Sequence, residues 1–130
     1  EGHGSSAGRV VFATVKGDIH SIGKDICISL LQSQSFDVDD LGVDVPAAAI
    51  VEAAGRADVV CLSALMTTTL PAMQDVVSRL SHERPNVSVL VGGAVVTREW
   101  ADSIGAGYSD DAPGCVHAVR AAISNKERAR

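Results

Sequence analysis

The sequence has 130 residues, of which 46% are hydrophobic and only 3% aromatic, so it is about one domain long with a core of Val, Ala, Leu and Ile. Its formal charge is −5, from 11 Lys and Arg against 16 Asp and Glu, and without a basic stripe it does not predict direct nucleic-acid binding. No apolar run approaches the roughly 20 residues that span a bilayer, and no signal peptide is recognisable, so we expect neither membrane contact nor export.

Predicted strands and helices alternate along the chain. Ile26, Leu30 and Leu31 recur at helical spacing after a first apolar strand, and Thr97 is a suitable N-cap for a later helix. In chain order the elements are a strand at 9–15, a helix at 23–35, a strand at 36–42, a helix from Pro46 to Gly55, a strand at 57–65, a helix at 71–80, a strand at 87–94, a helix at 97–104, a strand at 106–110 and a helix at 113–123. The strand at 57–65 is the most hydrophobic, so we expect it at the centre of the sheet.

This alternation predicts a parallel, doubly wound sheet with right-handed crossovers. We assign the flavodoxin-like (Rossmann-like) α/β class, with five strands in the order 2-1-3-4-5, and expect one domain at residues 9–124. Residues 1–8 are small and polar and predict a disordered tail or linker. The polar residues 125–130 predict a frayed C-terminal tail.

The three cysteines predict a reducing environment. Cys27, Cys61 and Cys115 form no CxxC pair, so they indicate no disulfide framework and favour a cytoplasmic location. Cys27 and Cys61 lie in apolar segments, which favours packing in the core. Cys115 lies near a predicted helix start, where a lowered thiol pKa is an alternative to the ordinary packing that we favour.

Three loops are expected at one edge of the sheet, beyond the carboxyl ends of the first, third and fourth strands, where such sheets bind ligands. The first holds Asp18 and His20, an arrangement in which the carboxylate can fix one imidazole nitrogen and free the other for a metal. On this spacing alone, a histidine bonded to its own turn is the commoner outcome. The hydroxyls at 63–69 and the glycine pair at 92–93 are also weak signals singly. Together the three loops predict a large cofactor whose tail lies along the sheet edge.

The segment GDIHSIG (17–23) resembles the Asp-x-His-x-x-Gly signature of cobalamin-binding domains, found in methionine synthase, corrinoid methyltransferase proteins and base-off mutases. In that family Ser-x-Leu and Gly-Gly follow at characteristic distances. Here Ser63 and Leu65 come 39 residues after the first motif (24–62), and the glycine pair comes 26 residues later (66–91). The resemblance covers about residues 9–123.

The resemblance implies a cobalamin cofactor, as methylcobalamin or adenosylcobalamin. His20 would bind cobalt in place of the cofactor's own dimethylbenzimidazole, and Asp18 would accept a hydrogen bond from the other imidazole nitrogen. Thr69 stands where methionine synthase has a serine that completes this relay, and Ser63 would bind the displaced base. The other predicted cofactor contacts are Ile19, Ser21, Ile22, Gly23, Leu65, Thr67, Gly92, Gly93 and Ala94. The glycines would leave room for the cofactor's tail.

The flanking segments KGDIHSIGKDI, DLGVDVP and LSALMTTTLPAM resemble corrinoid methyl carriers, although Ser21 and Asp25 depart from the common residues there. No stretch of the chain resembles the helical domain that caps the upper cobalt face. We therefore expect a methyl-carrier subunit or domain that works with a methyltransferase or substrate-activating protein, or with a helical cap in trans, and has no catalysis of its own. A cobalamin-binding sensor or carrier module and, less favoured, the small subunit of a carbon-skeleton mutase are the alternatives.

Overall fold

The computed structural model of the chain describes residues 6–128. In chain order its elements are β1 (Gly8–Val15), α1 (Ile22–Ser33), β2 (Phe36–Val45), α2 (Ala47–Ala54), β3 (Val59–Ser63), the 3-10 turn η1 (Thr67–Thr69), α3 (Leu70–Glu83), β4 (Ser88–Gly92), α4 (Arg98–Ser103), β5 (Gly107–Tyr108) and α5 (Ala112–Arg128). All strand pairs are parallel, and the strand order is β2-β1-β3-β4-β5. The predicted fold class and strand order are confirmed.

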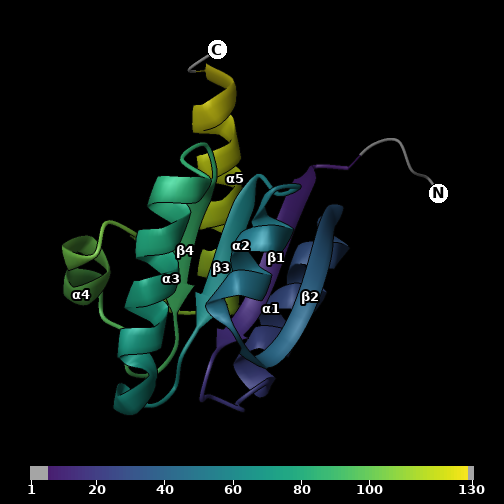
Figure 1. Cartoon of the computed structure of the whole chain (residues 1–130). Coiled ribbons are helices and arrows are strands. Elements are labelled where there is room, and N and C mark those ends of the chain that lie inside the picture. Colours follow the sequence, from purple (N-terminus) through teal and green to yellow (C-terminus); the bar gives the residue numbers. More distant parts are fainter. Residues whose placement is uncertain (1–5, 129–130) are drawn as a thin grey trace.

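Helices cover both faces of the sheet (Figure 1). Helices α1 and α5 pack beside each other on one face, and α2 and α3 pack on the other. Strand β3 is buried along its whole length, which confirms that the most hydrophobic strand is central. Alternate residues of a strand point to opposite faces, so β3 supplies Val60 and Leu62 to one hydrophobic cluster and Val59 and Cys61 to the other.

The carboxyl ends of the strands lie at the lower end of the molecule in Figure 1, together with the loop that joins β1 to α1. Strand β1 pairs with β2 on one side and β3 on the other, so the strand order reverses there. The chain leaves β1 and β3 towards opposite faces of the sheet, which opens a crevice between the carboxyl ends of these two strands. Any ligand site of this fold is expected at this edge.

Strand β2 does not end at Gly42, as predicted, but continues to Val45. Its register against β1 shifts twice near this end, and both Gly42 (φ +94°) and Asp44 (φ +53°) adopt left-handed backbone conformations. Gly42 was predicted to end the strand, whereas it lies in a bulged part of β2 that continues to pair with β1.

Helix α5 extends to Arg128, beyond the predicted end at residue 123. Lys126 helps to hold this last part, because its Nζ atom donates to the Asp58 carbonyl at 3.3 Å and lies 3.9 Å from the Asp58 carboxylate. Residues 125–128 of the predicted tail are therefore helical. Most of the predicted N-terminal tail, residues 1–5, and the last two residues of the chain lie outside the described residues.

The remaining helix boundaries differ from the predictions by a few residues. Helix α3 includes His82, which was expected to lie beyond it. The N-cap prediction is confirmed, since Thr97 Oγ1 accepts a hydrogen bond from the Trp100 N–H at 3.1 Å. Among residues 6–128 there is no helix whose length and apolar character would let it cross a membrane.

Candidate functional site

Asp18 is the centre of a hydrogen-bonded network in the loop between β1 and α1. Its side chain is fully buried, and its Oδ1 atom lies 2.6 Å from His20 Nδ1. Its Oδ2 atom accepts a hydrogen bond from the Leu65 N–H at 2.7 Å and another from the Thr69 hydroxyl at 3.0 Å. The fold thus brings the first two predicted loops into direct contact across 47 and 51 residues of sequence.

The environment of Asp18 lowers the pKa of its carboxyl to about 2. Burial by itself raises this pKa, but hydrogen bonds from the Leu65 backbone, the His20 ring and backbone, and Thr69 outweigh burial together. The carboxylate is therefore ionised at neutral pH and can only accept hydrogen bonds, so His20 Nδ1 carries the hydrogen between them. In a neutral imidazole this tautomer leaves Nε2 with a free electron pair, on a side chain that is 46% exposed.

The backbone of this loop is also held from the sheet. The Thr14 hydroxyl, buried at the end of β1, donates to the His20 carbonyl at 2.9 Å. The Asp18 N–H donates to the Val15 carbonyl at 3.0 Å, and the Asp18 carbonyl accepts from the Asp44 N–H at 2.9 Å. Thr14 and Asp44 were not among the predicted site residues, although a polar residue inside an apolar strand is a usable signal for Thr14.

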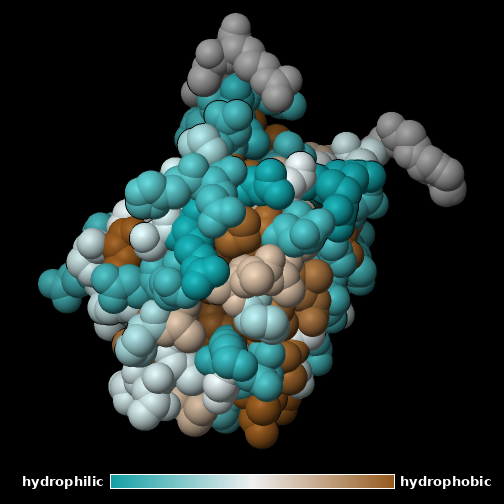
Figure 2. Space-filling model, viewed as in Figure 1, coloured by the Kyte–Doolittle hydropathy of each residue, from teal (hydrophilic) through white to brown (hydrophobic). Residues whose placement is uncertain are grey.

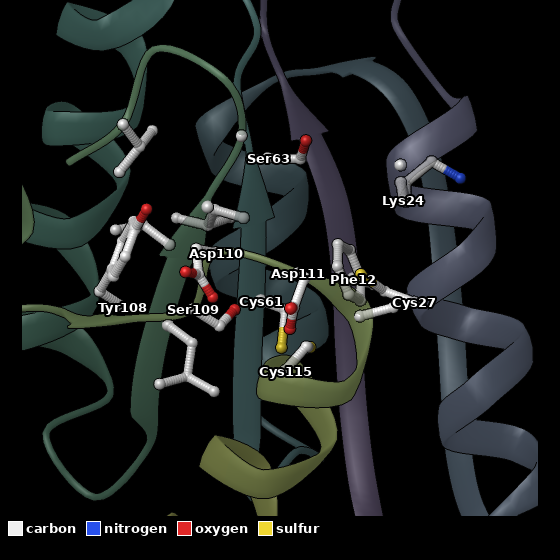
Figure 3. A pocket seen from close by; sticks show the side chains of 18 of the residues that line it. Phe12, Lys24, Cys27, Cys61, Ser63, Tyr108, Ser109, Asp110, Asp111 and Cys115 are labelled. Carbon is white, nitrogen blue, oxygen red and sulfur yellow. The ribbon is translucent and has the colours of Figure 1, made fainter. Parts of the chain in front are cut away.

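A cavity of about 520 Å³ lies at the carboxyl ends of β3 and β4 (Figure 3). Its floor includes Phe12, Cys61, Leu90 and Cys115, which all belong to the buried hydrophobic cluster under α1 and α5. The predicted site residues that line it are Gly23, Ser63, Leu65, Gly92, Gly93 and Ala94. The cavity is thus mainly apolar at its floor and is bordered by the second and third predicted loops.

The far wall of the cavity comes from a region that was not predicted to belong to the site. Tyr108, Ser109, Asp110 and Asp111 line it, at the end of β5 and the start of α5 (Figure 3). The rule that ligands bind beyond the carboxyl ends of parallel strands applies equally to the fifth strand. Applied there, it would have found this wall.

Glycine at 92 and 93 is required by the protein's own backbone. A Cβ atom on Gly93, whose φ is +122°, would overlap the carbonyl oxygen of Ala64. A Cβ atom on Gly92 would lie 2.9 Å from the carbonyl oxygen of Ser109. Both residues line the cavity, but side chains there would meet backbone atoms of neighbouring loops. These glycines were predicted to leave space for a cofactor tail. In the structure they are also needed because the loops that follow β3, β4 and β5 approach one another closely there.

The other predicted contacts lie around the mouth of the site. Ile19 and Ile22 are 74% and 77% exposed, and Ile26, one helical turn after Ile22, is 56% exposed. Figure 2 shows hydrophobic residues gathered at the lower end of the molecule, where Figure 1 places the loop between β1 and α1. Ser21 is the N-cap residue of α1, and Thr67 is exposed in η1.

The cysteines converge on the cavity, where all three contribute to its lining (Figure 3). A hydrogen bond with Cys115 and burial raise the pKa of Cys27. The contact with Cys27 lowers the pKa of Cys115, but its contact with Cys61 and its burial raise it further, so the net shift is upward. The thiols of Cys27 and Cys115 are therefore protonated at neutral pH, as ordinary packing predicts.

Lys24 is buried beside the cavity, and its Nζ atom binds Asp25 at 2.8 Å and Asp40 at 2.9 Å. Figure 3 shows its amine directed away from the cavity. Within the described part of the chain, no group of three or more His, Cys, Asp or Glu residues could hold a metal ion.

The fold and the site define a flavodoxin-like domain that presents one imidazole nitrogen at the switch point of its sheet, next to a cavity at the carboxyl ends of β3 and β4. The sequence model of the B12 binding domain matches residues 8–120, and the chain belongs to this family. Corrinoid binding is therefore the function of the domain.

The chain is similar to several corrinoid proteins. The chain is 50% identical over 122 residues to the dimethylamine corrinoid protein 1 of Methanosarcina acetivorans, covering 89% of this chain and 57% of that protein. The structure of the Methanosarcina barkeri monomethylamine corrinoid protein is similar, with a TM-score of 0.84 at 32% identity, over 89% of this chain and 58% of that one. A methanol:cobalamin methyltransferase complex of the same organism gives a TM-score of 0.85 at 29% identity, over 97% of this chain and 49% of that one. The chain thus spans about half the length of these proteins.

Proposed function

We propose that the domain binds its corrinoid with the cofactor's own base displaced and with His20 Nε2 as the lower axial ligand of cobalt. The observation that carries this proposal is the 2.6 Å contact between His20 Nδ1 and the ionised, buried Asp18. It fixes the tautomer in which Nε2 is the donor, and a carboxylate on the opposite nitrogen makes that donor more basic. Of the two imidazole nitrogens, only Nε2 then remains available for a metal.

The residues present fit a cofactor with a nucleotide tail. A cavity of about 520 Å³ opens next to the His20 loop, and ligand pockets usually enclose roughly 300–1,000 Å³. We infer that the displaced base and its tail occupy this cavity. Ser63 would bind a polar edge of the tail, while Phe12, Leu90 and the thiols form an apolar floor for the base.

We further propose that the chain is the corrinoid-carrying part of a methyltransferase system of the methylamine type, with methylcobalamin as the working form. The names of the relatives support this assignment. A bound corrinoid supplies a cobalt that can carry a methyl group. The chain's own residues orient the cofactor and hold a proton on His20 Nδ1, while the Asp18 carboxylate stabilises any positive charge on the ring.

The exposed isoleucines support the need for a partner. Ile19 and Ile22 lie on either side of His20 in the sequence, Ile26 follows one helical turn later, and all three leave branched apolar side chains in solvent. Such a patch is favourable only if something covers it. We propose that the corrin macrocycle and then a methyltransferase, or a helical cap domain, cover this patch in the working assembly.

The proposal is tested by titrating the chain with methylcobalamin and recording the cobalt absorption spectrum. Wild-type protein should convert the cofactor to the base-off, histidine-ligated form. His20→Ala should bind more weakly and lose the signature of a nitrogen ligand, because no other imidazole lies in this loop. His117→Ala, which removes an exposed histidine of α5, is the matched control and should behave as wild type.

An unchanged spectrum and affinity for His20→Ala would remove His20 from coordination. Retention of the cofactor's own base on cobalt in the wild-type complex would do the same. Methyl transfer is tested separately, by asking whether the methylated holoprotein gives up its methyl group to an acceptor when a methylamine-type methyltransferase is added. Failure of that reaction, with binding intact, would favour a sensor or carrier module.

A further inference from the structure

The end of β2 has an unusual backbone. Between Ala13 and Val15 of β1 there is one residue, whereas their partners Gly42 and Val45 on β2 enclose two. The additional residue belongs to a bulge that contains Asp44, whose φ is +53°. Left-handed conformations are unfavourable for residues with a Cβ atom, although aspartate and asparagine tolerate them better than most. A structure that maintains this conformation must gain from it elsewhere.

The side chain and the backbone N–H of Asp44 both bind the loop between β1 and α1 that carries His20, which we call the histidine loop. Its Oδ1 atom accepts a hydrogen bond from the Gly17 N–H at 2.7 Å. Its own N–H donates to the Asp18 carbonyl at 2.9 Å. A single residue of β2 therefore holds two successive residues of the loop, one through its side chain and one through its backbone. The bulge makes this double contact available because it turns a strand residue out of its regular pairing.

The two contacts complement those on the other side of the loop. The Asp18 carboxylate is held by the β3 side of the site through Leu65 and Thr69. The Asp18 carbonyl is held by the β2 side through Asp44. The residue that orients the His20 ring is thus tied to both neighbours of β1, so its peptide cannot rotate without breaking a bond to one of them.

We infer that Asp44 is a positioning residue for the cobalt ligand, acting through the backbone of Gly17 and Asp18. This inference extends the proposed role of His20 and rests on it. Asp44 does not line the cavity, and its hydrogen bonds to this loop go to the Gly17 N–H and the Asp18 carbonyl, not to the imidazole. Its effect is to restrict the loop so that Nε2 is already directed outward in the free protein. Loss of the Gly17 bond leaves the loop able to sample other conformations, and His20 then binds cobalt less often.

The substitutions at this position separate the hydrogen bond from the backbone conformation. Asp44→Asn keeps a side-chain oxygen acceptor and tolerates positive φ. Asp44→Gly is free of strain at positive φ but loses the acceptor, and Asp44→Ala loses the acceptor and keeps the strain. Asp39→Gly, at an exposed position of the same strand, controls for the general cost of glycine in β2.

The first measurement uses the chain without any corrinoid. We expect the Gly17 amide of wild type to be protected in hydrogen exchange monitored by NMR, and Asp44→Gly to accelerate it by roughly tenfold, the scale of one charge-assisted hydrogen bond. Asp44→Asn and Asp39→Gly should leave it within a factor of two or so of wild type. An unprotected Gly17 amide in wild type would overturn the inference without any variant, even if a variant did not fold.

The second measurement is the fraction of bound methylcobalamin in the histidine-ligated form, with His20→Ala included in the same series. Affinity and ligated fraction should fall roughly three- to tenfold in Asp44→Gly, further in Asp44→Ala, and recover in Asp44→Asn. Equal behaviour of wild type and Asp44→Gly, while His20→Ala loses ligation, would overturn the role of Asp44 and leave that of His20 intact. A spectrum that His20→Ala does not change would instead overturn the proposed function.

Discussion

The two halves of the site are built differently. In the histidine loop, the buried polar atoms are paired with one another: Asp18 alone accepts bonds from His20, Leu65 and Thr69. In the cavity, the floor is formed by carbon and thiol groups, and the wall at Gly92 and Gly93 is closely packed backbone. The loop is thus organised by hydrogen bonds before any cofactor arrives, whereas the cavity depends on the shape that neighbouring loops give it.

This difference predicts different responses to substitution. Changes in the loop should alter the ligation of cobalt and leave the packing of the domain largely intact. Changes in the cavity should alter either stability, where backbone atoms meet, or the entry of the nucleotide tail, where there is open space. A corrinoid without a nucleotide tail, cobinamide, separates the two halves, because it can use the histidine but has nothing to place in the cavity.

The largest effect is expected for Gly93→Ala. The new Cβ would overlap the Ala64 carbonyl oxygen at a residue whose φ is +122°, so both loops must move. We expect a loss of about 2–4 kcal/mol in the free energy of unfolding, measured by urea denaturation. Gly105→Ala is the matched control, since Gly105 also has positive φ (+77°) but its Cβ would meet no atom within 4 Å. If both variants lose the same free energy of unfolding, the close approach of the loops at Gly93 does not contribute to the loss.

The second prediction concerns binding of the cofactor's nucleotide tail and not the stability of the domain. Gly23 lines the cavity, lies in α1, and its Cβ would meet no atom within 4 Å. Gly23→Leu should therefore fold at least as well as wild type, because glycine in a helix costs about 0.5–1 kcal/mol relative to alanine. Its side chain should obstruct the cavity and weaken methylcobalamin binding by at least roughly tenfold. Cobinamide binding, measured by the same spectral titration, should change much less; equal loss of both ligands would contradict a separate slot for the tail.

The smallest expected effect is on the stability of the domain and its unfolding at low pH when Thr69 is replaced. The folded-state pKa of Asp18 is about 2, below its usual 3.8, so its ionisation stabilises the fold fully above about pH 4, and this contribution is lost as the pH falls towards 2. Thr69→Val removes one of the bonds that hold the carboxylate. We expect a loss of about 1 kcal/mol at pH 7 and the onset of acid unfolding at a slightly higher pH. Thr69→Ser, which keeps the hydroxyl, should follow the wild-type curve in circular dichroism.

Much of the fold and the first half of the site could be predicted because they depend on short-range patterns. Apolar runs alternating with helical periodicity identified the strands, and the identity of the central strand followed from its composition. Asp18 and His20 are two residues apart, so their ability to meet is a local property. Thr69 was reached only through family resemblance, because nothing near it in the sequence indicates that it contacts Asp18 from 51 residues away.

The amino-acid sequence alone determined the class of fold and the sheet edge that carries the site, because periodicity is written along the chain, and the motif spacing, through the family resemblance, predicted His20 as the cobalt ligand. Only the tertiary structure decided that Asp44 holds the loop, that Tyr108 and Asp110 form the far wall, and that Gly93 is needed beneath Ala64. These relations depend on strand register, on a bulge and on backbones from different loops lying in contact. Such features arise from pairing between distant segments, which local patterns do not encode.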